Sequence, residues 1–81
     1  MKNIAVVTGG SSGIGKAISV ELAKAGFEVV IVYAHDKRKA HAVYSEILRL
    51  GGTSRIFKTD VTSEEEIAWL MTVLGPWQLT L

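Results

Sequence analysis

Short apolar runs alternate with longer stretches of helical periodicity along the chain. The runs cover residues 3–8, 28–33 and 55–58. The first two are continuously apolar, as Ile4-Ala5-Val6-Val7 and Val29-Val30-Ile31-Val32. Runs of this length without polar alternation are typical of strands that are buried on both faces of a parallel sheet. The pattern therefore predicts strands at all three positions.

A helix is predicted after each strand, because apolar residues recur there every three or four positions. The three expected apolar stripes are Ile14, Ala17, Ile18, Leu22 and Ala25; Ala40, Val43, Tyr44, Ile47 and Leu50; and Ile67, Leu70, Met71 and Leu74. The first helix is expected over residues 13–25, and Gly26, Gly51-Gly52 and Gly75-Pro76 are the three stop signals. Asp36 is the expected N-cap of the second helix, and Ser63 with Glu66 forms a capping signature for the third.

The resulting order, β-α-β-α-β-α, predicts an α/β fold with a parallel sheet between two helix layers. We interpret residues 1–75 as a three-layer, Rossmann-type half domain with its first strand in the middle of the complete sheet. Residues 76–81 are expected to be an unstructured tail, and the start of a fourth strand is the alternative. In that arrangement the first strand has a bare, apolar edge.

Composition excludes several classes of protein. The chain has 81 residues, no cysteine and a formal net charge of +1. We therefore expect one domain without disulfides, and neither nucleic-acid nor membrane binding. The short basic cluster Lys37-Arg38-Lys39 is interpreted as a solvated helix start. His35 precedes the helix, and its spacing from His41 does not place the two on one helix face, so no metal site is expected. With no signal peptide, the expected location is cytoplasmic.

The candidate chemistry lies between the first strand and the first helix, at residues 8–16. Glycines permit a sharp turn there and a close approach of a ligand to the backbone. The N-terminus of the following helix directs N–H groups and the positive end of its dipole at the same place. The stretch is therefore a predicted phosphate-binding turn.

These residues resemble a known family. Thr8-Gly9-Gly10-Ser11-Ser12-Gly13-Ile14-Gly15 is similar to the Thr-Gly-x-x-x-Gly-Ile-Gly signature of short-chain dehydrogenases/reductases, and Asp60-Val61 looks like the family's adenine-contacting pair. The resemblance covers residues 3–74, and the local sequence is most similar to that of 3-oxoacyl-[acyl-carrier-protein] reductases. The implied cofactor-binding residues are Gly9, Ser11, Ser12, Gly13, Ile14, Gly15, Tyr33, Asp60 and Val61.

The resemblance also implies a role for each position. The three glycines Gly9, Gly13 and Gly15 would admit the pyrophosphate, which would meet the Ile14 N–H. Ser11 and Ser12 would line the adenosine ribose and its phosphate.

The adenine amino group would donate to the Asp60 side chain, and the Val61 backbone would touch the ring. Tyr33 stands where NAD-specific members place an acid for the ribose 2′-OH. Asp36 lies near the generic spacing for that acid, but helix capping explains it better.

NADP(H) is therefore favoured over NAD(H) as cofactor. Because Tyr33 stands in place of the acid, a 2′-phosphate is not repelled there, and His35, Lys37 and Arg38 could attract it. The family's usual basic residue in the glycine turn is absent, because Ser12 occupies its place.

No catalytic residue is assigned. The family's catalytic Ser and Tyr-x-x-x-Lys follow the fourth strand, and the 81 residues contain neither in that place. Tyr33 and Lys37 have the Tyr-x-x-x-Lys spacing, but the pattern places them on a strand end and a helix start. The sequence of residues 10–17 is also close to the phosphate-loop motif of nucleoside triphosphatases. The last position of that motif needs a hydroxyl group, which Ala17 lacks.

Two hypotheses remain from the sequence. In the first, the chain is a truncated NAD(P)(H)-dependent oxidoreductase that retains the dinucleotide-binding half and is inactive alone. The resemblance implies that the full-length family transfers hydride between the nicotinamide cofactor and a carbonyl or hydroxyl group, with 3-oxoacyl thioesters among its substrates, and that its members are usually homo-oligomeric. In the second, the chain is a stand-alone, non-enzymatic NADP(H)-binding or interaction module. Either form could self-associate through an open sheet edge.

Overall fold

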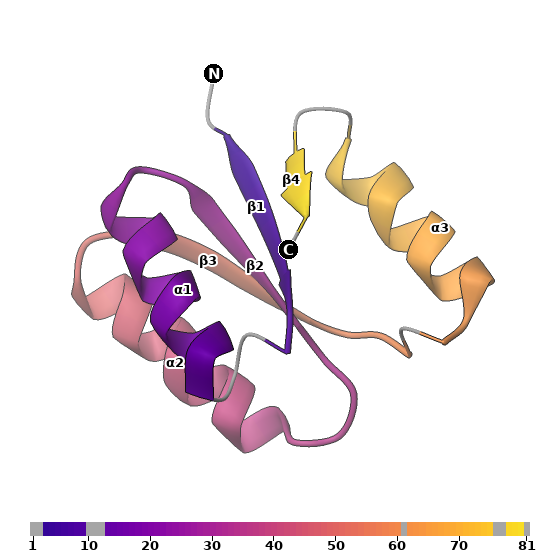
Figure 1. Cartoon of the computed structure of the whole chain (residues 1–81), viewed down its shortest axis with the longest axis horizontal. Coiled ribbons are helices and arrows are strands. Elements are labelled where there is room, and N and C mark those ends of the chain that lie inside the picture. The colour runs from indigo at the N-terminus through magenta and orange to yellow at the C-terminus, as the bar shows by residue number, and fades with distance from the viewer. Residues whose placement is uncertain (1–2, 10–12, 61, 76–77, 81) are drawn as a thin grey trace.

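The computed structural model describes residues 3–9, 13–60, 62–75 and 78–80, the last three through their backbone. Strands and helices alternate along these residues (Figure 1). Their bounds are β1 Ile4–Thr8, α1 Gly13–Lys24, β2 Glu28–Tyr33, α2 Lys37–Arg49, β3 Thr53–Lys58, α3 Glu64–Leu74 and β4 Gln78–Thr80. The predicted α/β fold is confirmed, and β3 begins two residues before its predicted start at residue 55.

The four strands form one parallel sheet in the order β3-β2-β1-β4. β1 lies inside the sheet, with Val6 opposite Val30 of β2 on one side and opposite Thr80 of β4 on the other. β2 pairs along its whole length with β3. Parallel pairing places all four carboxyl ends at one edge, which is where the candidate turn begins.

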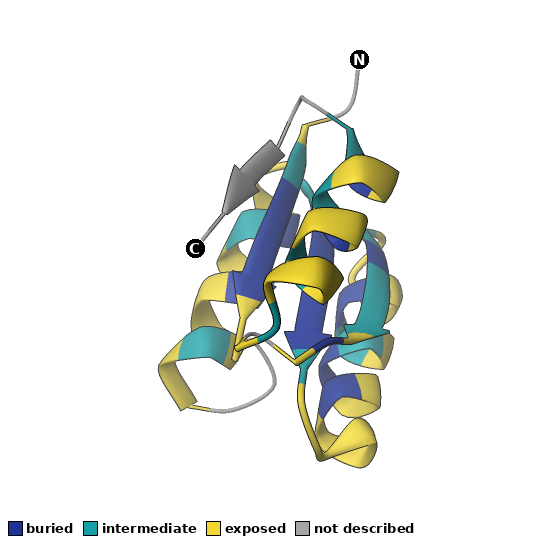
Figure 2. Ribbon diagram, turned by 90° about the vertical axis from the view of Figure 1, so that its right-hand side faces the viewer, coloured by how far each residue is buried: buried dark blue, intermediate teal, exposed yellow. Residues whose placement is uncertain are grey.

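The continuous apolar strands bury side chains on both faces of the sheet, as expected. One face carries Val7, Val29 and Ile31 under α1 and α2, and the other carries Val6, Val30 and Val32 under α3. Figure 1 shows α1 and α2 on one side of the strands and α3 on the other, and Figure 2 shows the buried strands between them. The structure therefore has three layers.

The predicted stripes of α2 and α3 contact the sheet. In α2, Ala40, Val43 and Ile47 are buried, and in α3 Leu70 and Leu74 are buried. Leu50, which was also predicted in the α2 stripe, is exposed and follows the end of the helix. The two predicted N-caps are also confirmed. The Lys39 N–H donates to Asp36 Oδ1 at 3.1 Å, and the Glu66 N–H donates to Ser63 Oγ at 3.3 Å.

The predicted stripe of α1 is wrong except at Leu22, which is partly buried against the core. Ile14 is 80% exposed and Ile18 is 37% exposed, whereas Ser19 and Ala23 are buried. Small side chains at the buried positions let the helix approach the sheet closely. The Ser19 hydroxyl donates to the Gly15 carbonyl oxygen at 2.8 Å, which gives this buried polar group a hydrogen-bond partner.

The prediction of an unstructured tail is wrong for residues 78–80, which form β4 and pair with Ile4–Val6 of β1. Residues 76, 77 and 81 lie outside the described part of the chain. The physical reason is the edge of β1, whose backbone groups attract any extended segment within reach. The edge that was expected to be bare is therefore covered over Ile4–Val6, and β4 becomes the last strand.

Among the described residues, no helix has both the length and the apolar character that a membrane crossing requires.

We predict that Gly52→Ala destabilises the fold. A Cβ on Gly52 would lie 2.9 Å from Ile47 Cγ2 and 3.3 Å from the Ile47 carbonyl oxygen, where α2 meets the start of β3. Overpacking of this kind costs about 1–3 kcal/mol, which urea denaturation would show as a lower free energy of unfolding. The control Ser45→Ala, on the exposed side of α2, changes that free energy by less than about 0.5 kcal/mol. Equal stability of Gly52→Ala and the wild type would contradict this close contact.

Candidate functional site

The loops that follow β1, β2 and β3 meet at the carboxyl edge of the sheet. Two backbone hydrogen bonds extend the strand pairing into these loops. The Gly9 N–H donates to the Val32 carbonyl oxygen at 3.2 Å, and the Thr59 N–H donates to the Tyr33 carbonyl oxygen at 3.0 Å. The glycine turn and the loop after β3 are therefore both held against the end of β2.

The glycine turn lies at the point where the chain changes face. β1 is followed by α1 on one face of the sheet, whereas α3 leads into β4 from the opposite face. The connections thus diverge between β1 and β4, which is the topological switch point of this sheet. In open α/β sheets, ligands bind at such a point outside the carboxyl ends of the strands.

Two glycines in the turn have backbone conformations that other residues rarely adopt. Gly9 has φ of 67° and Gly13 has φ of 52°. A Cβ on either residue would meet no atom of the described residues within 4 Å. The backbone conformation therefore requires glycine at both positions, and no described residue fills the space that either Cβ would take. Ser11 and Ser12 lie outside the described residues.

The N-terminus of α1 begins at the same turn. Its first turn contains no acidic residue, so no carboxylate of its own competes there for the free N–H groups and the positive end of the helix dipole. Gly15 lies in this first turn and Ile14 is largely exposed. The arrangement suits an anion such as a phosphate group.

Asp60 follows β3 and its carboxylate is held in place by Thr62. Asp60 Oδ1 accepts hydrogen bonds from the Thr62 hydroxyl at 2.6 Å and from the Thr62 N–H at 2.9 Å. These bonds, with a smaller effect of the charge on His35, hold the pKa of Asp60 below its usual value. Oδ2 accepts no hydrogen bond within the described part of the chain and is available to a ligand. Val61 lies outside that part.

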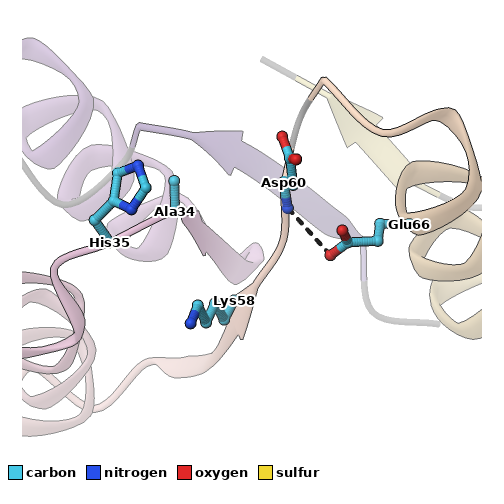
Figure 3. A pocket seen from close by; sticks show the side chains of 5 residues that line it. All are labelled: Ala34, His35, Lys58, Asp60 and Glu66. Carbon is cyan, nitrogen blue, oxygen red and sulfur yellow. Dashed lines mark hydrogen bonds between the residues drawn. The ribbon is translucent and has the colours of Figure 1, made fainter.

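A pocket of about 440 Å³ opens between the ends of β2 and β3. Figure 3 shows its lining residues Ala34, His35, Lys58, Asp60 and Glu66. The Asp60 N–H donates to Glu66 Oε1 at 3.2 Å, so the first turn of α3 is bonded to the loop after β3. The predicted capping signature is therefore half realised, because the Glu66 carboxylate binds this N–H instead of that of Ser63.

Sequence reasoning missed two of these residues as part of a site, Lys58 and Glu66. Lys58 is the last residue of β3. Because parallel strands end at a common edge, its place in the sequence could have indicated that it lies near the site. Glu66 had a sufficient local explanation as a capping residue, so only its contact with Asp60 reveals the second role.

Tyr33 and Asp36 lie at the two ends of the short connection between β2 and α2. Tyr33 is the last residue of the strand, is half-buried and packs against the cluster under α1 and α2. The Asp36 carboxylate caps α2, which confirms capping as its local role. Tyr33 and Lys37 lie on a strand and on a helix, as expected, and do not share a helix face.

A second open pocket of about 440 Å³ lies on the first turns of α2 and is lined by Lys37, Arg38, His41 and Ala42. Within the described ranges, no three His, Cys, Asp or Glu side chains gather in a way that could hold a metal ion.

We predict that Thr62→Val raises the pKa of Asp60 toward its usual value of 3.8, because the hydroxyl donor to Oδ1 is lost while the backbone donor stays. A lowered pKa means that the ionised carboxylate stabilises the fold above pH 3.8, and that this contribution is lost as the pH falls through the lowered value. An NMR titration of the Asp60 carboxyl carbon measures the shift. Thr72→Val, whose hydroxyl bonds Ala68 on α3, should leave the pKa of Asp60 unchanged. An unaltered titration in Thr62→Val would contradict this origin of the shift.

Comparisons with known proteins agree with this geometry. A sequence model of the short chain dehydrogenase family matches residues 3–74. The chain is 42% identical over 67 residues to the hydroxynaphthalene reductase-like protein Arp2 of Metarhizium guizhouense, covering 83% of this chain and 25% of that protein. It is 40% identical over 67 residues to the 3-oxoacyl-[acyl-carrier-protein] reductase FabG of Staphylococcus aureus, covering 83% of this chain and 27% of that protein.

Solved structures share the fold. A metagenomic short-chain oxidoreductase in complex with NADP superposes with a TM-score of 0.88 at 35% identity, over 96% of this chain and 37% of that chain. The acetoin dehydrogenase YohF of Salmonella typhimurium gives a TM-score of 0.83 at 28% identity, over 99% of this chain and 35% of that one. The chain spans about a quarter of the length of the curated relatives. With its family match, its parallel sheet and its glycine turn, the chain belongs to the short-chain dehydrogenase family.

Proposed function

We propose that this chain binds a nicotinamide dinucleotide and supplies the cofactor-binding half of an oxidoreductase. The observation that carries the proposal is the open glycine turn at the switch point between β1 and β4. A pyrophosphate carries two negative charges close to the backbone, and both the turn and the N-terminus of α1 favour that charge.

In this proposal the dinucleotide extends from the turn toward the end of β3. Gly9, Gly13 and Gly15 admit the pyrophosphate, and the Ile14 N–H donates to it. Asp60 Oδ2 accepts a hydrogen bond from the adenine amino group, because Thr62 engages Oδ1 and fixes the carboxylate.

Four further residues complete the proposed adenosine site. Val61 contacts the adenine ring, and Ser11 and Ser12 line the ribose. Tyr33, at the end of β2, lies beside the adenosine ribose.

We propose NADP(H) as the preferred cofactor. The end of β2 offers Tyr33 in place of an acid, and the Asp36 carboxylate is occupied as a helix cap. Lys58 lies with His35 in the pocket at the strand ends, beside Asp60 and Glu66, and the cationic Lys37 and Arg38 line the pocket on α2. The NADP in the metagenomic neighbour supports this choice.

The proposed reaction is hydride transfer between the cofactor and a carbonyl or hydroxyl group. The likeness to the Staphylococcus aureus reductase supports 3-oxoacyl thioesters as the substrate class. The resemblance assigns proton transfer to a Ser and a Tyr-x-x-x-Lys pair, which the 81 residues do not contain in the required place. Our proposal for these residues is therefore cofactor binding in the cytoplasm, and not hydride transfer by themselves.

We predict that Gly13→Ala weakens NADPH and NADH binding equally, by about tenfold or about 1.4 kcal/mol, because its Cβ projects into the space reserved for the pyrophosphate. Isothermal titration calorimetry measures the affinities. Gly26→Ala is the matched control, because Gly26 also has a positive φ with no atom near its Cβ but lies after the far end of α1. Both variants lose stability, and only Gly13→Ala should lose affinity. Equal affinities in the two variants would overturn the proposed function.

We predict tighter binding of 2′,5′-ADP than of 5′-ADP if the basic end of α2 holds a 2′-phosphate. The double substitution Lys37→Ala and Arg38→Ala should remove about fivefold of that preference, or about 1 kcal/mol, because charge-assisted bonds to phosphate are lost. Lys24→Ala, in the last turn of α1 at the opposite end of the sheet, should keep the preference intact. A wild-type chain that binds both nucleotides equally would contradict the choice of NADP(H).

A further inference from the structure

A small pocket between the end of β3 and the first turns of α3 is not explained by cofactor binding. It measures about 190 Å³ and is lined by Lys58, Thr59, Glu65, Glu66 and Trp69. It lies at the end of the sheet opposite β4, because β3 is the other outermost strand of the described sheet. Pockets for drug-sized ligands measure about 300–1,000 Å³, so this one suits a single side chain. We call it the Trp69 pocket.

Trp69 supplies the apolar wall of this pocket. Its side chain is on the flank of α3 that faces β3, where its ring meets the ring of Phe57 edge to face at a centroid distance of 6.3 Å. This contact holds the indole against the sheet, yet Trp69 remains 59% exposed. A large aromatic side chain that is exposed beside a hollow is available to stack on a ligand.

Thr59 is a buried polar residue of the same pocket. The side chain of Phe57 packs in the cluster under α3, and side chains alternate along a strand, so Thr59 two residues later also faces α3. The bond from the Thr59 N–H to the Tyr33 carbonyl oxygen continues the strand pairing to this point. Thr59 is only 3% exposed, and its hydroxyl has no hydrogen-bond partner among the described residues. Because an unpaired buried hydroxyl is unfavourable, its place in a pocket indicates a ligand that pairs with it.

The charges of the Trp69 pocket favour a cation. Two glutamates line it against one lysine. Glu65 forms no ion pair within the described part of the chain, and Glu66 uses only Oε1 to accept the Asp60 N–H. Figure 3 shows the Lys58 ammonium pointing away from Glu66, so the lysine contributes mainly its apolar stem. The carboxylates are therefore available to hydrogen-bond donors of a ligand.

A guanidinium group matches these features better than an ammonium group does. It is flat and weakly hydrated, and it carries five N–H donors. Its face can stack on the Trp69 indole as a cation–π contact, while its donors bond the two carboxylates and the Thr59 hydroxyl. An ammonium group has no flat face to stack, and its stronger hydration makes it harder to bury.

The surface beside the pocket indicates the source of the guanidinium group. Val73 lies one turn after Trp69 on α3 and is 47% exposed. Residues four apart on a helix share a face, so the apolar surface continues from the pocket along α3. The neighbours of an arginine in a polypeptide can cover this surface, whereas free arginine has no side chain left to do so.

We propose that the Trp69 pocket binds an arginine side chain of another polypeptide, stacked on Trp69 and bonded by Glu65, Glu66 and Thr59. The polypeptide's apolar residues next to the arginine cover Val73. The proposal does not rest on cofactor binding, because Glu65 and Trp69 do not line the pocket at the strand ends.

The first test is an NMR titration of the 81-residue chain with the blocked peptide acetyl-Leu-Arg-Leu-amide, followed through the backbone amide signals of Thr59 and Glu65. The same peptide with citrulline in place of arginine has the same shape and no charge. The arginine peptide should bind about tenfold tighter, because charge-assisted bonds and the cation–π contact are lost with citrulline. Equal affinities of the two peptides, or no binding of the arginine peptide, would overturn the proposal.

Free L-arginine, titrated in the same way, distinguishes the two sources of the group. It should bind about fivefold more weakly than the arginine peptide, because it leaves Val73 uncovered. Binding of free arginine as tight as that of the peptide would overturn the polypeptide as its source.

Two glutamates of the first turn of α3 provide matched variants. Glu65→Gln and Glu64→Gln each remove one charge from that turn, but only Glu65 lines the pocket. Glu65→Gln should bind the arginine peptide about fivefold more weakly, and Glu64→Gln should change the affinity less than about twofold. Trp69→Leu keeps an apolar side chain without the aromatic face and should also lose about fivefold. Circular dichroism first establishes that the variants fold. An equal loss in Glu64→Gln and Glu65→Gln, or full affinity in Trp69→Leu, would contradict the assigned site.

Discussion

The pairing of β1 on both of its sides is the interaction on which the rest of the structure depends. Val6 is opposite Val30 on one side and opposite Thr80 on the other, and it is fully buried. This central position lets β1 carry one helix layer on each face. It also places the end of β1, and the glycine turn after it, where the connections of the sheet diverge. Without β4 the turn would lie at a sheet edge and not at a switch point.

The candidate site is positioned mainly by backbone contacts between loops. Gly9 bonds the end of β2, Thr59 bonds the same strand one residue later, and Asp60 bonds the first turn of α3. Each bond joins the loop of one strand to a neighbouring element, so the loops cannot move independently without losing these bonds. The pocket is lined by the cationic Lys58 as well as by the acidic Asp60 and Glu66, which suits a ligand that carries both phosphate and hydrogen-bond donors.

The packing of α1 helps to position the candidate site. The helix buries its small residues Ser19 and Ala23 and leaves Ile14 and Ile18 exposed. It begins at Gly13, directly after the glycine turn that follows β1. The helix thus presents its N-terminal N–H groups at the edge of the sheet where an anion can bind.

The six elements from β1 to α3, the two caps and the glycine turn could be predicted because each depends on residues close together in the chain. Apolar continuity, helical spacing, Asp36, Ser63 and the positive φ of Gly13 are all local properties. The pairing of β4 with β1 could not be predicted, because it joins residues more than 70 positions apart. The contact of Glu66 with Asp60 and the pocket around Lys58 were likewise decided by tertiary structure, as was the orientation of α1. Periodicity shows that a helix has an apolar side, but only packing against the sheet selects which side is buried.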